Sequence, residues 1–336
     1  MHIKTYSFTN ASVNYYFDAS FASLKKLVNP KTTVLITDQN IVAVHNKKFK
    51  DWNTIVLKAG EEFKVQQTVD SIIRQLIEMQ ADRKWTIIAV GGGVVTDITG
   101  YVASIFLRGV AFGFVPTTIL GMVDAAIGGK NGVDVDVYKN MVGTINQPEF
   151  ILYDINFLKT LPDNEWRNGF AEIIKHACIR DAAMFKALED LSLPKIKKSK
   201  EVLVKLVQRN ALLKTKIVQE DEFEKNQRRL LNFGHTLGHA LEKTYEFSHG
   251  EAISIGMAFA TELSASFLKF KAAPKVISLI DKYDLPVAAG YNKRKVFEVL
   301  LQDKKREGDH LNFILLEKIG KAVIKKLPLD KLYSFI

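Results

Sequence analysis

The segment Trp85-Thr-Ile-Ile-Ala-Val-Gly-Gly-Gly93 decides the fold class. Its first six residues form a mostly apolar run, which is typical of a buried central strand. Three glycines follow at once, and residues 94–106 then have a helical pattern. A strand, a glycine turn and a helix in this order present backbone N–H groups and a helix N-terminus to a phosphate group.

The glycine turn has two interpretations. Three consecutive glycines do not make the full Gly-x-Gly-x-x-Gly spacing, and a tight strand-to-helix turn without any ligand would also favour them. We expect pyrophosphate binding at this turn. Asp97, in the first turn of the following helix, would either cap that helix or orient a ligand group.

The segments around this turn predict the rest of the fold. Before residue 155, short β-rich runs alternate with helical patterns, which favours a parallel sheet with crossover helices. After residue 155 the patterns are mainly helical until a strand at 311–316. We therefore predict a Rossmann-like α/β nucleotide-binding domain over residues 1–157 and a mainly α-helical domain over residues 158–336. The expected strands are 33–37, 54–57, 85–90 and 111–115, and the expected helices of the second half are 166–179, 182–191, 201–219, 230–245 and 253–269.

A second informative stretch is Leu230-Leu-Asn-Phe-Gly-His-Thr-Leu-Gly-His-Ala-Leu-Glu242. His235 and His239 are four residues apart, so they share one face of a helix. His249 follows after a short connection. Two imidazoles at this spacing with a third nearby favour a zinc site, although polar helix residues bonded to backbone or water would give the same pattern. A metal site would also need a carboxylate.

Composition narrows the class of protein. The net charge is +10, but the basic residues are scattered and no aromatic residues interleave with the basic runs, so a nucleic-acid partner is not expected. No apolar run is long enough to span a bilayer, and residues 1–5 do not begin a signal peptide. The single cysteine, Cys178, rules out an internal disulfide and suits a reducing cytoplasm.

Several charged residues stand where ligands commonly bind. Asp38 follows a strand, where it would take ribose hydroxyl groups or form a turn. Asp124, Lys130 and Lys139 lie in or beside glycine-bearing segments after strands, which favours the ligand edge of the sheet, although ordinary surface charges would give the same pattern. Lys139 ends an irregular segment. Glu172 stands in an apolar helical run, where a buried charge needs a partner, although an ordinary i,i+3 pair with Lys175 would also explain it.

Together these stretches resemble the 3-dehydroquinate synthases, which belong to the sugar phosphate cyclase superfamily. The resemblance runs in order from about residue 60 to about residue 260, and many separate motifs agree. They are Gly91-Gly-Gly-Val-Val-Thr-Asp97, Arg108-Gly109, Pro116-Thr-Thr118, Val123-Asp124, Gly128-Gly-Lys130, Lys139-Asn140, Ala171-Glu-Ile-Ile-Lys175, Lys214, Asp221-Glu222, Asn232-Phe-Gly-His-Thr-Leu-Gly-His-Ala240 and His249-Gly-Glu251.

The resemblance implies an NAD-binding domain, a helical metal-binding domain and a cleft between them. It implies that zinc, or cobalt in its place, is held by Glu172, His235 and His249. This changes the interpretation of the helical pair, because only His235 becomes a ligand and His239 faces the substrate instead. Substrate hydroxyl groups or water would complete the metal coordination.

The resemblance also implies the residues at the cofactor and the substrate. Those implied at NAD are Asp38, Glu61, Lys64, Gly91, Gly92, Gly93, Asp97, Thr117, Thr118, Lys130, Lys139 and Thr160. Those implied at the substrate or in catalysis are Arg108, Asp124, Lys130, Asn140, Lys175, Lys214, Arg228, Asn232 and His239, with either Lys304 or Lys305. Ala125-Ala126 and Asn131 depart from residues common in the family, but neither change removes a charge or a ligand.

The implied reaction converts 3-deoxy-D-arabino-heptulosonate 7-phosphate to 3-dehydroquinate and phosphate, a step of the shikimate pathway. It proceeds through transient oxidation by NAD, β-elimination of phosphate, re-reduction and intramolecular aldol closure. The alternatives are another sugar phosphate cyclase of the same fold, or a metal-dependent alcohol dehydrogenase similar to glycerol dehydrogenase, which would release NADH. A homodimer is expected because family members are commonly dimeric, and neither nucleic acid nor a membrane is expected as a partner.

Overall fold

The computed structural model describes residues 2–136, 138–301 and 306–336, and within them the chain forms two compact units. The first unit contains Met1–Glu165 and Val204–Phe223, and the second contains Trp166–Leu203 and Glu224–Ile336. Packing therefore divides the chain near residue 165 and assigns most of one later helix to the first unit. The boundary at residue 157 stays a prediction about where the two functions divide.

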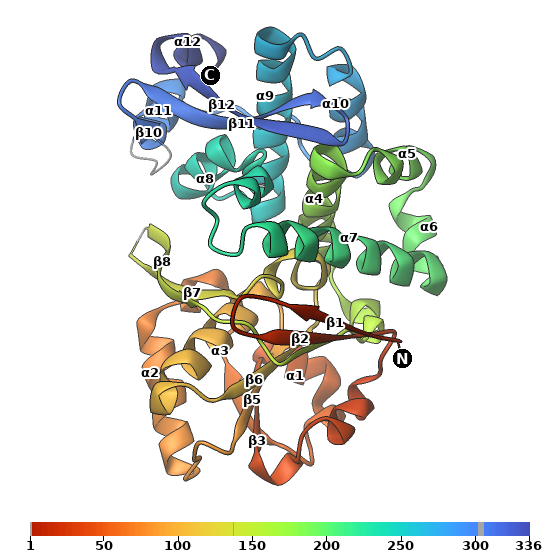
Figure 1. Cartoon of the computed structure of the whole chain (residues 1–336), viewed down its shortest axis with the longest axis vertical. Coiled ribbons are helices and arrows are strands. Elements are labelled where there is room, and N and C mark those ends of the chain that lie inside the picture. Colours follow the sequence, from red (N-terminus) through yellow and green to blue (C-terminus); the bar gives the residue numbers. More distant parts are fainter. Residues whose placement is uncertain (1, 137, 302–305) are drawn as a thin grey trace. The chain divides into compact units, whose positions relative to one another are not determined.

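The first unit is built on a seven-stranded sheet (Figure 1). Strand β1 is antiparallel to β2, and every other neighbouring pair is parallel. In spatial order the strands are β1 (His2–Ser7), β2 (Ser12–Phe17), β9 (Phe150–Leu152), β6 (Ala111–Pro116), β5 (Thr86–Gly91), β3 (Thr33–Asp38) and β4 (Asn53–Leu57). The expected strands at β3, β4, β5 and β6 are confirmed, and this sheet confirms the α/β class.

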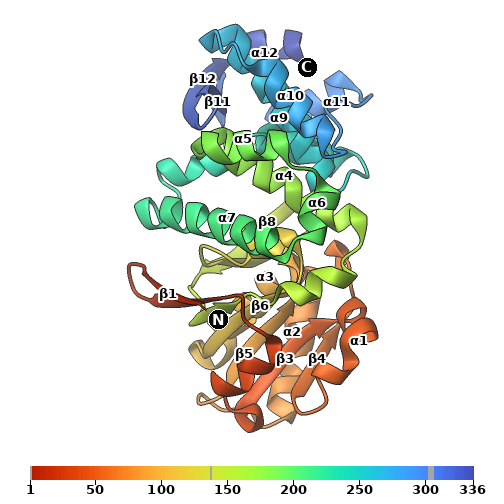
Figure 2. The ribbon, with the colours of Figure 1, turned by 90° about the vertical axis from the view of Figure 1, so that its right-hand side faces the viewer.

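Helices cover the sheet, and α1 lies beside β3 and β4 (Figure 2). Alternate strand residues such as Leu35, Ile88 and Val115 join one apolar cluster with the rings of Phe21 and Trp52. Such alternation is the expected result of a strand whose successive side chains point to opposite faces. The helices of this unit are α1 (Gln39–His45), α2 (Gln66–Glu78) and α3 (Gly93–Ile105).

A two-stranded hairpin leaves the sheet after β6. It consists of β7 (Lys130–Val135) and β8 (Tyr138–Ile145), which pair in antiparallel fashion. The expectation that Lys139 ends an irregular segment is therefore wrong, since that residue lies within β8. The exposed pattern of β8 explains the error, because it lacks the alternation of apolar and polar residues that marks a half-buried strand.

The second unit is mainly helical, which confirms the expected class. Its core joins α8, α9 and α11 to a small antiparallel sheet and α12. The elements are α4 (Asp163–Arg180), α5 (Ala182–Asp190), α6 (Leu193–Lys198), α8 (His235–Thr244), α9 (His249–Leu268), α10 (Ala273–Lys282), α11 (Lys293–Leu301), β10 (Arg306–Glu307), β11 (His310–Lys318), β12 (Lys321–Pro328) and α12 (Leu329–Phe335). Helix α7 (Lys200–Glu220) belongs to the first unit from Val204 onward.

The expected helix over residues 230–245 is not continuous. A 3₁₀ helix covers Gln227–Asn232, and α8 begins only at His235. Gly234 stands between them with φ of +82°, a left-handed conformation that glycine adopts without strain. Within the described residues, no helix is long and apolar enough to cross a membrane.

Candidate metal and cofactor sites

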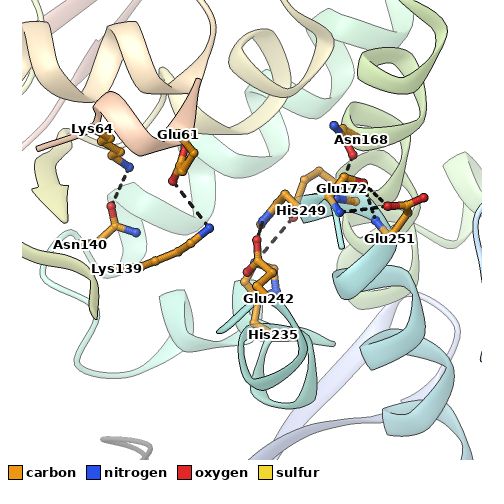
Figure 3. Close-up of polar contacts among 12 residues, drawn as sticks. Glu61, Lys64, Lys139, Asn140, Asn168, Glu172, His235, Glu242, His249 and Glu251 are labelled. Atoms are coloured by element: carbon orange, nitrogen blue, oxygen red, sulfur yellow. Dashed lines mark hydrogen bonds and ion pairs between the residues drawn. The ribbon is translucent and has the colours of Figure 1, made fainter. Parts of the chain in front are cut away.

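Three side chains of the second unit converge on one point. Glu172 lies in α4, His235 is the first residue of α8 and His249 is the first residue of α9. Oε1 of Glu172 lies 3.2 Å from Nε2 of His249 and 3.6 Å from Nε2 of His235 (Figure 3). The three ligand atoms lie within 4.8 Å of one another, as expected for groups that surround one metal ion at about 2.0–2.2 Å each.

Close packing of α8 against α9 brings the two histidines together. A Cβ atom added at Gly234 would stand 2.6 Å from Cγ of Met257, and one at Gly256 would stand 1.9 Å from the backbone oxygen of Gly234. A Cβ atom at Gly238 would stand 2.7 Å from Cδ1 of Ile253. These glycines allow the helices to approach closely enough for His235 and His249 to face Glu172.

The start of α9 is attached to α4. The backbone N–H of Gly250 donates to Oδ1 of Asn168 at 3.0 Å, and Asn168 precedes Glu172 by one helical turn. A Cβ atom at Gly250 would stand only 2.5 Å from Cα of Asn168. Ser248 and Glu251 form a capping box that begins α9. The position of His249 relative to Glu172 therefore depends on the side-chain amide of Asn168 and on the absence of a side chain at Gly250.

The surroundings shift the pKa values of the two histidines in opposite directions. Burial, assisted by the nearby charge of Lys175, holds the pKa of His235 well below its usual range, so this ring is neutral and its Nε2 lone pair is open to a metal. Burial opposes charge on His249 too, but hydrogen bonds with Glu172 and Glu242 outweigh it and raise the pKa of His249 to about 10. Glu172 also forms a buried ion pair with Lys175. One carboxylate and two imidazoles are a donor set that fits a divalent metal ion.

His239 stands beside this group without belonging to it. Its ring centroid lies 5.1 Å from that of His235, at an interplanar angle of 81°. Among the described residues, the close group around Glu172 includes His235 and His249 but not His239. The geometry thus agrees with the assignment of only one member of the helical pair as a ligand, and the assignment itself stays a prediction.

The glycine turn of the first unit has the form that a dinucleotide requires. Gly92 is the N-cap of α3, and a Cβ atom there would stand 3.1 Å from the methyl group of Thr118. A Cβ atom at Gly93 would stand 3.2 Å from Cβ of Ala125. Nearby, the buried hydroxyl groups of Thr37 and Thr117 have no hydrogen-bond partner within the described part of the chain. A glycine turn with no room for side chains allows a ligand to approach the backbone, and the two hydroxyl groups at the carboxyl ends of parallel strands are available to it. Both features fit the binding of NAD.

Lys64 connects several of the residues expected at the cofactor. Its ammonium group lies 2.6 Å from Oδ2 of Asp97. It also lies 2.7 Å from Oδ1 of Asn140, a contact drawn in Figure 3. Asp97 is therefore an ion-pair partner rather than the cap of α3. Burial nevertheless raises the pKa of Asp97, against the opposing effect of Lys64. Glu61 and Lys139 form a longer pair at 3.7 Å.

Two more residues expected at the cofactor, Asp38 and Thr160, have clear contacts in the first unit. Oδ1 of Asp38 accepts from the backbone N–H of Ile41 at 3.0 Å and so caps α1. Burial raises the pKa of Asp38, although backbone hydrogen bonds from Ile41 and Asn40 oppose this. The hydroxyl group of Thr160 lies 2.9 Å from Nε2 of His45, a residue that the sequence analysis did not single out.

The residues expected at the substrate fall into both units. In the first, Lys214 contacts Asp124, and Lys130 begins β7 with an exposed side chain. Arg108 is exposed after α3 at φ of +66° and has no ion pair with any described residue. In the second, Lys175, Arg228, Asn232 and His239 lie in or near α4 and α8, and Nδ2 of Asn232 donates to Oε1 of Glu224 at 3.0 Å. Lys304 and Lys305 lie outside the described residues.

Comparison with known proteins decides the family. The family model described as 3-dehydroquinate synthase N-terminal matches residues 54–168, and the one described as 3-dehydroquinate synthase C-terminal matches residues 169–306. The chain belongs to the 3-dehydroquinate synthase family. A 3-dehydroquinate synthase of Campylobacter concisus is 40% identical over 303 residues, which cover 87% of this chain and 86% of that protein.

Solved structures place this 3-dehydroquinate synthase family member among the sugar phosphate cyclases. A 2-epi-5-epi-valiolone synthase from Streptomyces hygroscopicus, solved with NAD+ and Zn2+, is 26% identical and superposes with a TM-score of 0.89 over 99% of this chain and 98% of its own. A 2-deoxy-scyllo-inosose synthase with carbaglucose-6-phosphate, NAD+ and Co2+ is 25% identical, with a TM-score of 0.87 over 99% and 98% of the two chains.

Two residues that contact the candidate metal site were not identified by sequence reasoning. Asn168 contacts the first turn of α9, and Oε1 of Glu242 lies 3.2 Å from Nδ1 of His249. The only available signal for Glu242 was its spacing of seven residues from His235, which places both on one helix face. Asn168 gave a similar signal, since it precedes Glu172 by four residues.

Proposed function

We propose that this member of the 3-dehydroquinate synthase family is an NAD- and metal-dependent carbon–oxygen lyase that converts 3-deoxy-D-arabino-heptulosonate 7-phosphate to 3-dehydroquinate and phosphate. The observation that carries the proposal is the convergence of Glu172, His235 and His249 in a chain of this family. It supplies one carboxylate and two imidazoles, and it leaves coordination positions for substrate, as open catalytic metal sites do.

The two bound groups supply chemistry that amino-acid side chains lack. When bound, NAD+ would supply a hydride acceptor that later returns the hydride, and zinc or cobalt would supply a Lewis acid for the hydroxyl group that is oxidised. Glu172, His235 and His249 hold the metal. The glycine turn before α3, together with Asp38, Lys64, Asp97 and Thr118, holds NAD. The solved cyclases with NAD+ and Zn2+ or Co2+ support NAD and a divalent metal as the bound groups.

The remaining residues bind the substrate and move protons. Its phosphate and carboxylate groups are anionic, and cationic side chains recognise such groups through charge-assisted hydrogen bonds. We assign this binding to Arg108, Lys130, Lys175, Lys214 and Arg228, with Asn140 and Asn232 as neutral donors. His239 is assigned as a proton carrier, because an imidazole titrates near neutral pH.

The second candidate function is that of another sugar phosphate cyclase. The likeness to two such enzymes over almost the whole chain favours it, since both share the fold. Their substrates, unlike the heptulosonate phosphate, would not require groups that recognise a carboxylate. The lower identity of these structures, 25–26% against 40% for the synthase of Campylobacter concisus, makes 3-dehydroquinate synthesis the first candidate.

One assay separates the candidates. Purified protein with NAD+ and zinc is expected to release phosphate from the heptulosonate phosphate without net accumulation of NADH. Phosphate release only from a sugar phosphate without the carboxylate would instead support another cyclase. Net NADH formation would support a dehydrogenase.

We also propose that the protein is a cytoplasmic homodimer. Exposed apolar side chains on β8, at the end of α3 and just after it support dimerisation, since large exposed apolar side chains are available for contact with a second copy. These residues are Ile105, Leu107, Met141, Val142 and Ile145. The single buried thiol of Cys178 suits a reducing compartment. Light scattering coupled to size-exclusion chromatography tests the dimer, and a monomer at micromolar concentration would contradict it.

A further inference from the structure

The two histidines beside Glu172 are oriented by different acceptors. Nδ1 of His235 lies 3.2 Å from the backbone oxygen of Phe233, and Nδ1 of His249 lies 3.2 Å from Oε1 of Glu242. Carbonyl and carboxylate oxygens only accept hydrogen bonds, so Nδ1 is the donor in each of these contacts. The other nitrogen, Nε2, faces Glu172 at 3.6 Å in His235 and at 3.2 Å in His249, where a bound metal would take the place of any proton on Nε2.

Helix α8 supplies the acceptor for a ring that belongs to α9. Glu242 follows His235 by seven residues, which is almost two helical turns, so both side chains lie on the same face of α8. His249 lies on the facing helix, and Figure 3 shows Glu242 directed at its ring. One face of α8 thus provides the first histidine and the carboxylate that contacts the second.

The carboxylate of Glu242 is almost completely removed from water. Its side chain is 4% exposed, whereas the ring of His249 is 30% exposed. Burial of a carboxylate is costly unless charged or polar partners compensate it, and the imidazole of His249 is one such partner of Glu242. A carboxylate that accepts from one imidazole nitrogen increases the electron density at the other nitrogen, which strengthens that nitrogen as a metal ligand.

We propose that Glu242 is a positioning residue of the metal site: it accepts the Nδ1–H of His249, fixes the orientation of that ring and directs Nε2 toward a divalent cation. This inference rests on the proposed function, because it takes Glu172, His235 and His249 as the ligands of zinc or cobalt. The ring of His235 is oriented by the backbone oxygen of Phe233, which substitution cannot remove. The ring of His249 is oriented by the side chain of Glu242, which substitution can remove.

Metal affinity gives a test that does not depend on turnover. The full-length protein is freed of metal with a chelator, and zinc is then titrated in competition with a chromophoric chelator. Glu242→Ala is expected to weaken zinc binding about 10–100-fold, the range typical for loss of such an outer carboxylate. Glu242→Gln keeps an acceptor oxygen but loses the charge, so its affinity should fall between that of Glu242→Ala and that of the unchanged protein.

A matched control comes from the same part of the chain. Glu246→Gln removes an exposed carboxylate four residues beyond Glu242, with the same change in net charge, and should leave zinc affinity unchanged. Circular dichroism establishes that each variant is folded. If Glu242→Ala fails to fold, the nearly isosteric Glu242→Gln carries the test, and zinc affinity equal to that of Glu246→Gln then overturns the inference.

The hydrogen bond itself is observable in zinc-loaded protein labelled with 15N-histidine. The Nδ1–H of His249 should give a deshielded signal that exchanges slowly with solvent. The signal should disappear in Glu242→Ala and persist, less deshielded, in Glu242→Gln. Unchanged zinc affinity and an unchanged signal in Glu242→Ala would overturn the role of Glu242 while the metal site stands. Failure of the unchanged protein to bind zinc would overturn both proposals.

Discussion

The ammonium group of Lys214 donates to two oxygen atoms of Asp124, the backbone oxygen at 2.7 Å and Oδ1 at 2.8 Å. The two residues are ninety positions apart, yet both belong to the first unit. Lys214 is buried in α7, and two bonds to one residue restrict a side chain that is otherwise flexible. Both residues were expected at the substrate, and their pairing means that a substrate would meet an ammonium group already oriented.

Loss of this oriented charge should weaken the reaction. Lys214→Ala is expected to lower kcat/KM for phosphate release by about 10–100-fold or more, because a hydrogen bond to a charged group contributes about 1.5–3 kcal/mol. Steady-state phosphate release measures the change. Lys216→Ala is the matched control, since Lys216 is exposed on the same helix. Equal kcat/KM values for the two variants would contradict a role of Lys214 at the substrate.

The helical histidine pair should separate into two roles. His235→Ala is expected to abolish tight zinc binding, because its Nε2 faces Glu172 at 3.6 Å. His239→Ala should retain zinc and lower kcat by about 10²–10⁴-fold, the usual contribution of general acid–base catalysis. Zinc content after dialysis and kcat measure the two effects. Equal zinc loss in both variants would show that the ligand assignment is wrong.

The charge of Asp38 is expected to lower the stability of the fold while it strengthens the binding of NAD. Burial raises its pKa, so the charged carboxylate costs stability above that raised pKa, and the cost disappears as the pH falls below the usual value of 3.8. Asp38→Asn keeps the cap of α1, since asparagine caps helices as well as aspartate does. The free energy of unfolding of the variant should therefore equal or exceed that of the unchanged protein at pH 7, with the difference vanishing as the pH falls below 3.8.

The same substitution should weaken NAD binding. Loss of a charged acceptor for ribose hydroxyl groups is expected to raise the Kd for NAD+ about 10–100-fold. Urea unfolding at several pH values and calorimetric titration with NAD+ provide the two measurements. A variant that is less stable at pH 7 and binds NAD+ equally well would refute both expectations.

The contact between Asn168 and Gly250 should control metal affinity without supplying a ligand. Gly250→Ala places a Cβ atom 2.5 Å from Cα of Asn168, so the start of α9 must shift and carry His249 away from Glu172. Asn168→Ala removes the acceptor for the N–H of Gly250 and is expected to cost about 1–3 kcal/mol of stability.

Both variants are expected to bind zinc about tenfold or more weakly than the unchanged protein, by analogy with other outer contacts of metal ligands. Chemical unfolding and zinc competition measure the two quantities. Gly290→Ala is the control, since a Cβ atom there has no neighbour within 4 Å among the described residues. If Gly250→Ala binds zinc as tightly as Gly290→Ala, the start of α9 does not set the ligand geometry.

Local patterns accounted for the elements predicted correctly. The strand at Thr86–Gly91 and the helix at Gly93–Ile105 follow from an apolar run, a glycine turn and helical periodicity, all of which lie within a few residues of one another. The strands β1, β2 and β9 were not predicted. Strand β9 has only three residues, and β2 acquires its place in the sheet by pairing with it across more than 130 residues of chain.

The break before His235 shows why helical spacing alone wrongly predicted one continuous helix over residues 230–245. A pattern from 230 to 245 is compatible with one helix, and only the left-handed φ of Gly234 shows that α8 begins at His235. Close approach of another helix leaves no room for a side chain at this position, since a Cβ atom on Gly234 would stand 2.6 Å from Cγ of Met257 in α9. Such contacts depend on residues distant in sequence.

The sequence by itself determined the α/β and helical halves, the glycine turn and the residue types suited to NAD and a metal, because each follows from short-range periodicity or from motifs that resemble a known family. Only the tertiary structure decided which of these residues meet. It brought Glu172 to His235 and His249, and it placed Glu242 against His249. The physical reason is that these contacts arise from the packing of separate helices, whose approach is set by glycines and buried polar groups on both partners.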